Sequence, residues 1–129
     1  MKLSDVFMLK QVLSLFSLSK KKKIVLFYRN FQSFQGGHLK TWNYFSHLND
    51  FDVFQPKIYF TSSSKWKENP WRGNCTPEKE WHPNSADILF LAGLDWSAVE
   101  KKDIDSEKPI INLIQHVRHA DPELSLIHI

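Results

Sequence analysis

Four short apolar runs place the strongest constraint on the fold of this 129-residue chain. They cover residues 23–28, 57–61, 87–93 and 109–114, and they are apolar along most of their length rather than alternating with polar residues. A strand that is covered on both faces has this pattern, whereas a strand with one face in water alternates. We therefore expect an α/β fold with a parallel, Rossmann-like sheet of about four strands.

The segments between the runs carry helix and turn signals. Residues 38–48 have a polar stripe opposite an apolar one, which predicts a helix, and Gly36-Gly37 opens it with a turn. Ser97 and Glu100 have the spacing of a capping box and predict a short helix through Lys102. Residues 62–86 have no periodicity, and we interpret them as a functional insertion whose tryptophans anchor it to the sheet rather than stack on sugar rings.

The N-terminal segment, residues 1–22, is predicted to be an amphipathic helix followed by a lysine linker. Residues 5–18 are apolar at helical spacing, and Lys20 to Lys23 follow directly. The helix is too short to span a bilayer and lacks a secretory cleavage site, so we expect a cytoplasmic protein. The lysines suit a peripheral contact with the anionic inner face of a membrane. The alternative is a helix packed on the domain beside a solvated charge run.

Charge and cysteine content argue against a nucleic-acid partner, an internal disulfide and a thiolate metal site. The net charge of +3 comes from the lysines at 20–23, and basic residues do not interleave with the aromatic residues, so no nucleic-acid partner is predicted. A single cysteine, Cys75, rules out an internal disulfide and a zinc site built on paired thiolates. We expect no bound metal and no cofactor.

Candidate binding residues fall where strands of such a sheet end, because ligands of open α/β sheets bind beyond the carboxyl ends of the strands. Arg29 and His38 follow the first run, close to Gly36 and Gly37. The two glycines open a helix, where free backbone N–H groups and the helix dipole favour a phosphate. A tight turn without a ligand is the alternative. No dinucleotide or P-loop motif is present.

A second polar group follows the fourth run and consists of His116, Arg118, His119 and Asp121. A histidine there can act as a general base or bond a hydroxyl or phosphate, an arginine can hold a phosphate in a fork, and Asp121 can orient an imidazole. Two alternatives stay open for this group. One is a metal site, for which the sequence identifies no third ligand. The other is a turn at Asp121-Pro122 with a histidine that bonds buried backbone.

Residues 124–129 are an unusual ending. The hexapeptide LSLIHI resembles the translation of a transposon-derived sequencing adapter. We therefore expect a partial domain at 23–123 followed by a tail that does not belong to the natural protein. A natural apolar strand is the alternative.

Five segments resemble the N-terminal domain of bacterial family-1-like glycosyltransferases of the GT-B fold. The resemblance spans about residues 23–123 and rests on FYRNF (27–31), GGHLKTWNYF (36–45), NPW (69–71), LFLAGLDW (89–96) and INLIQHVRHADP (111–122). Such enzymes have two Rossmann-like halves. The N-terminal half mainly binds the acceptor, and the C-terminal half, which would be missing here, mainly binds the nucleotide-sugar donor.

The resemblance implies roles for the candidate residues. Gly36 and Gly37 would lie near the donor diphosphate, and His116 or His119 would be the catalytic histidine that contacts the transferred sugar. Substrate-binding residues would be Arg29, His38, Arg118 and Asp121. The acceptor would be a glycan or a lipid-linked molecule, no metal would be needed, and the fragment would be inactive alone. The alternatives are a stand-alone α/β module that binds a phosphate or sugar without catalysis, and a small interaction protein that uses its aromatic loop.

Overall fold

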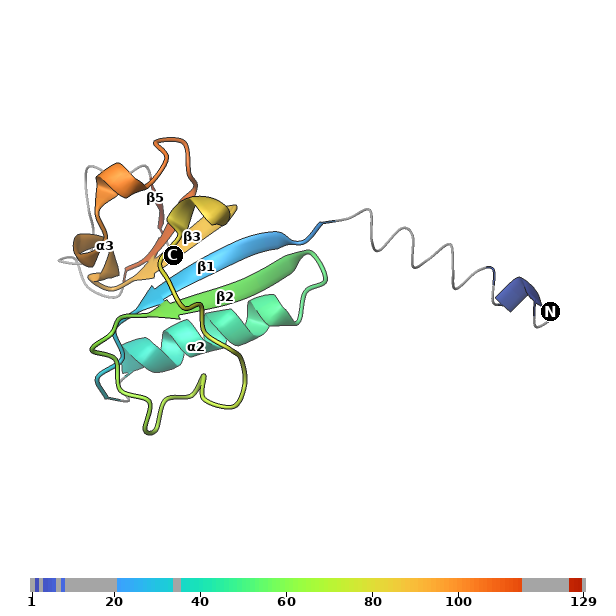
Figure 1. The fold of residues 1–129 in the computed structure, drawn as a ribbon, viewed down its shortest axis with the longest axis horizontal. Helices are drawn as coiled ribbons and strands as arrows, with labels where there is room; N and C mark the ends of the chain where they lie inside the picture. Colours follow the sequence, from blue (N-terminus) through green and yellow to red (C-terminus); the bar gives the residue numbers. More distant parts are fainter. Residues whose placement is uncertain are drawn as a thin grey trace.

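A computed structural model describes residues 2, 4–6, 8, 21–33 and 36–114, together with the backbone of 126–128. These residues form one sheet with the strand order β2-β1-β3-β4-β5, in which every neighbouring pair is parallel (Figure 1). The predicted parallel α/β sheet is confirmed. The strands are β1 (Lys23–Arg29), β2 (Phe54–Phe60), β3 (Ile88–Ala92), β4 (Ile110–Leu113) and β5 (Leu126–His128).

Strand β5 lies within the segment that the sequence analysis assigned to a foreign tail. Leu126 pairs with Ile110 and His128 with Asn112, which adds a strand to the four expected. A strand was one of the two alternatives for this segment. Its origin in a sequencing adapter stays a prediction.

Helix α2 (Gly36–Asn49) follows β1 and confirms the helix predicted at 38–48. Near the N-terminus, residues 4–6 and 8 are helical, as expected where the predicted amphipathic helix begins. The rest of 5–18 lies outside the described residues, so the amphipathic helix stays a prediction. In the part of the chain that the structure describes, no helix has the length and apolar character to cross a bilayer.

The capping box predicted at Ser97 and Glu100 is wrong. Helix α3 (Asp95–Ala98) begins before Ser97, whose hydroxyl donates to the Leu94 carbonyl at 2.6 Å, and a separate turn η2 (Lys101–Asp103) follows. The helix begins early because Gly93, with φ of 62°, turns the chain immediately after β3. It ends early because Val99 is extended and buried in the core.

Both faces of the sheet are buried, as the continuous apolar runs predicted. On the α2 face, the Phe27 ring of β1 stacks on the Phe90 ring of β3 with centroids 4.4 Å apart. On the other face, Leu26 packs with Leu89 and Leu91. Successive residues of a strand point to opposite faces, so each central strand contributes to both clusters.

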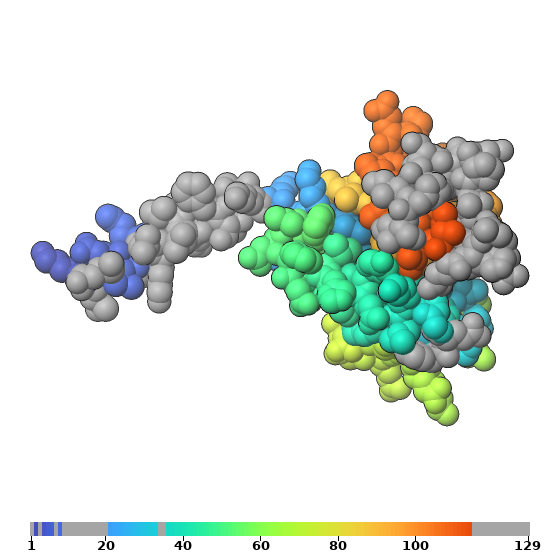
Figure 2. Space-filling model, turned by 180° about the vertical axis from the view of Figure 1, so that it is seen from behind, coloured from blue at the N-terminus to red at the C-terminus, as the bar shows by residue number. Residues whose placement is uncertain are grey.

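The long connection between β2 and β3 wraps around the edge of the sheet instead of forming a crossover helix. It first lies beside α2, where Trp71 is fully buried, and then pairs Glu78 with Tyr59 at the outer side of β2 (Figures 1 and 2). It continues over the opposite face through Trp81 and the turn η1 (Pro83–Ser85). The anchoring role predicted for its tryptophans is confirmed for Trp71 and Trp81.

Candidate functional site

The strand order places a switch point between β1 and β3. The connection that follows β1 leads to β2 on one side, and the connection that follows β2 returns across the sheet to β3 on the other side. In open α/β sheets the ligand crevice lies at such a point, beyond the carboxyl ends of the strands. Arg29 is the last residue of β1, and Asp95 follows the turn after β3.

Arg29 joins three elements at this point. Its Nη1 atom lies 3.1 Å from Asp95 Oδ2 and donates to Thr41 Oγ1 at 3.2 Å. Its Nη2 atom lies 3.1 Å from Nδ1 of His38. The Arg29 side chain is only 10% exposed and the Asp95 side chain only 12%. We refer to Arg29, His38, Thr41 and Asp95 as the arginine cluster.

Thr41 fixes the orientation of the first turns of α2. Its hydroxyl is fully buried, accepts from Arg29 and donates to the carbonyl oxygen of Gly37 at 2.9 Å. A hydroxyl has one proton, so the donation to Gly37 leaves its lone pairs for the guanidinium. The helix is therefore held against the end of β1 by a directed chain of hydrogen bonds.

Burial shifts the pKa values of two side chains in the arginine cluster. It lowers the pKa of His38 to about 4, and the neighbouring Arg29 charge acts in the same direction. Burial raises the pKa of Asp95 to about 7, against the opposing effects of Arg29 and of a backbone hydrogen bond with Ala92. Near neutral pH the His38 imidazole is therefore uncharged, while Asp95 is close to its titration midpoint.

A second polar network holds the loop after β1 to the loop after β2. Asn30 Oδ1 accepts from Gln32 Nε2 at 2.6 Å, from the Thr61 hydroxyl at 3.0 Å and from the Ser63 hydroxyl at 3.2 Å. The backbone N–H of Phe31 also donates to the Ser64 hydroxyl at 2.9 Å. This network joins the loop after β1 to the loop after β2 at the carboxyl edge of the sheet.

Two of the residues predicted to bind substrate, Arg29 and His38, are brought together at this edge, but the guanidinium is directed into the protein. Gly36 begins α2, and a Cβ there would meet no heavy atom within 4 Å. The carbonyl oxygen of Gly37 accepts the hydrogen bond from the Thr41 hydroxyl. The other four predicted site residues, at positions 116, 118, 119 and 121, lie outside the described residues.

Thr41, Asp95 and Asn30 were not predicted from the sequence as site residues. Asp95 follows a glycine turn at the end of a buried run, which is a usable signal. The sequence carries no such signal for Thr41, because a threonine inside a predicted helix is ordinary. The run of hydroxyl residues at 61–64 directly after the second apolar run is the signal for the Asn30 network.

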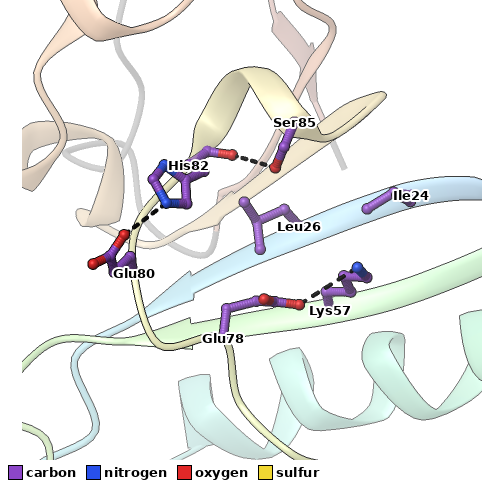
Figure 3. A pocket seen from close by; sticks show the side chains of 7 residues that line it. All are labelled: Ile24, Leu26, Lys57, Glu78, Glu80, His82 and Ser85. Atoms are coloured by element: carbon purple, nitrogen blue, oxygen red, sulfur yellow. Dashed lines mark hydrogen bonds and ion pairs between the residues drawn. The ribbon is translucent and has the colours of Figure 1, made fainter.

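A shallow cavity lies on the face opposite α2 and contains none of the predicted site residues. Figure 3 shows Leu26 between two ion pairs, His82 with Glu80 at 2.8 Å and Lys57 with Glu78 at 3.6 Å. These side chains are substantially exposed, and such pairs contribute about 0–1 kcal/mol. The cavity is lined by Ile24, Leu26, Lys57, Glu78, Glu80, His82 and Ser85.

Across residues 2–114, gaps aside, the structure has no group of three or more histidine, cysteine or acidic side chains arranged to hold a metal ion. No protein-family model, curated protein or solved structure matches the chain.

Proposed function

We propose that this chain forms the acceptor-side half of a bacterial GT-B glycosyltransferase that transfers a sugar from a nucleotide-sugar to a glycan or a lipid-linked acceptor. One observation carries the proposal. Among the described residues, every buried polar side chain lies within the segments that resemble this family. These side chains belong to Arg29, His38, Thr41, Asn69 and Asn112.

Burying polar groups away from water costs free energy unless they are hydrogen-bonded, and the bonds that offset this cost fix where these side chains lie. Three of them, Arg29, His38 and Thr41, meet at the carboxyl edge of the sheet beside the start of α2. The first turn of a helix favours negative charge, and the Arg29 cation adds to this effect only where Asp95 is protonated. A donor diphosphate approaching Gly36 from a second domain would meet this positive potential.

A stand-alone binding module is the second candidate. The observation that favours it is that the Arg29 guanidinium is already bonded to Thr41 and His38 and paired with Asp95. An arginine whose two Nη atoms are both engaged within the protein chiefly supports the shape of a site. Such a module would bind a phosphate or sugar at the start of α2 without turnover.

The test uses the full-length protein encoded at the natural locus. It is assayed for release of nucleoside diphosphate from a panel of nucleotide-sugars with glycan and lipid-linked acceptors. Gly36→Val is expected to lower turnover by about tenfold or more, because a branched side chain obstructs anion approach to the helix. Asn43→Val, at an exposed position of the same helix, is the matched control and is expected to retain turnover. Binding without release would favour the module, and neither binding nor release would overturn both candidates.

The role proposed for the histidines after β4 is tested in the same assay. His116→Ala and His119→Ala are made separately, and one of them is expected to lower turnover by about a hundredfold, the lower range for a general acid or base. Unchanged turnover in both variants would remove these histidines from the reaction.

A further inference from the structure

We infer that His38 is held by Arg29 as the neutral tautomer that carries its proton on Nε2, so that toward the ligand of the proposed function it would donate a hydrogen bond and not act as a general base. The tautomer follows from the contact with Arg29 alone, whereas the donor role rests on the proposed function.

The chemistry of the two side chains fixes the tautomer. A guanidinium has only N–H donors and no acceptor, and it stays protonated in proteins. Arg29 Nη2 lies 3.1 Å from Nδ1 of His38, and both side chains are buried. Nδ1 must therefore be the acceptor and cannot carry a proton. A neutral imidazole holds its single proton on the other nitrogen, so Nε2 is the N–H group.

Protonation of the ring is blocked at the same contact. A second proton would sit on Nδ1, facing the positive guanidinium, and would replace a hydrogen bond with a repulsion between like charges. Burial opposes the imidazolium as well, and together these effects hold the pKa of His38 well below its usual value. A general base must accept a proton from its substrate, and this environment disfavours the resulting cation.

Two further residues keep the guanidinium in this position. Thr41 accepts from Nη1 at 3.2 Å, and Asp95 lies 3.1 Å from the same nitrogen. They act on His38 through Arg29 and are positioning residues. The cluster thus fixes the histidine at the start of α2 as an N–H donor through Nε2.

The first experiment records the ring nitrogens of His38 by NMR in the whole chain, labelled with nitrogen-15, between about pH 5 and 8. We expect a protonated Nε2 and an unprotonated Nδ1 throughout the range. The exposed His47 on the same helix supplies a reference signal, and His38→Gln assigns the spectrum. A proton found on Nδ1, or a His38 ring that becomes an imidazolium by about pH 6, would overturn the inference.

Two variants show whether Arg29 is the cause. Arg29→Gln removes the charge, so the His38 ring is expected to take up a proton at higher pH than in the wild type. Arg29→Lys keeps a cation that can only donate, and it is expected to restore the wild-type spectrum in part. If the charge at position 29 has no effect on the ring in folded variants, Arg29 does not control the tautomer.

Turnover and ligand binding of the full-length protein provide a separate test. His38→Gln keeps an N–H donor near the position of Nε2 but cannot act as a base, whereas His38→Leu removes both properties. We expect His38→Gln to retain turnover or ligand binding within about tenfold and His38→Leu to lose more. Equal loss in both variants would contradict the donor role. A wild type that has no turnover and binds no sugar or phosphate would contradict the proposed function, while the NMR result would still decide the tautomer.

Discussion

The indole ring of Trp71 meets the ring of Trp42 edge to face, with centroids 5.3 Å apart and planes at 80°. Trp71 belongs to the long connection between β2 and β3, and Trp42 belongs to α2, so this contact fastens an irregular segment to the helix. Phe45 and Phe60 also lie against Trp71, which is fully buried. The connection is therefore part of the core rather than a surface loop.

Replacing Trp71 should be among the most damaging single changes to the core. We expect Trp71→Ala to lower the free energy of unfolding by about 3–5 kcal/mol, because it removes a large buried ring and leaves a cavity. Urea denaturation followed by circular dichroism measures the change. Trp66→Ala is the matched control, since Trp66 is 39% exposed in the same connection and should cost much less. A loss for Trp71→Ala as small as the loss for Trp66→Ala would mean that the connection is not anchored at Trp71.

The ion pair between Arg29 and Asp95 should behave as a buried pair. Asp95→Ala leaves the guanidinium without its counter-ion, and we expect a loss of about 3–5 kcal/mol at about pH 8, where Asp95 is ionised. Arg29→Met should cost a similar amount. The double variant should lose less than the sum of the two, because the pair is removed together. Strict additivity in chemical denaturation would show that the two side chains are not coupled.

The pH dependence of stability should reveal the raised pKa of Asp95. The folded protein binds this proton up to about pH 7, whereas the unfolded chain releases it near the ordinary value of 3.8. Between these values the folded state holds more protons, so stability contributed by Asp95 falls as the pH rises. The stability difference between wild type and Asp95→Asn should therefore decrease from about pH 4 to 7 and level off above it. A difference that is constant across this range would show that Asp95 titrates normally.

His38 should have the opposite effect in an overlapping range. Its folded pKa of about 4 lies below the ordinary 6.5, so the unfolded chain takes up the proton first as the pH falls. The stability it contributes is complete above pH 6.5 and is lost toward pH 4. The difference between wild type and His38→Gln should thus increase with pH. Differences that run in the same direction for both residues would contradict these assignments.

The glycines of the site should differ in their tolerance of a side chain. Gly93 has φ of 62°, a conformation that an L residue adopts at a cost of about 1–2 kcal/mol, so Gly93→Ala should lower the thermal unfolding temperature. Gly36 lies in α2 with open space around its Cα. Gly36→Ala should leave stability unchanged or raise it by up to about 1 kcal/mol. Equal losses in both variants would show that Gly36 also has a structural role.

The apolar runs and the helical pattern at 38–48 were enough to predict the parallel sheet, its central strands and helix α2, because continuous burial on two faces requires apolar runs that can be recognised locally. They also located Arg29 and His38 at the carboxyl edge. The contact between these two side chains, and the way Thr41 and Asp95 hold them, could not be predicted from the sequence. Those contacts join the end of β1, the first turns of α2 and the turn after β3, and they form only once strand order and crossover direction bring these three elements together.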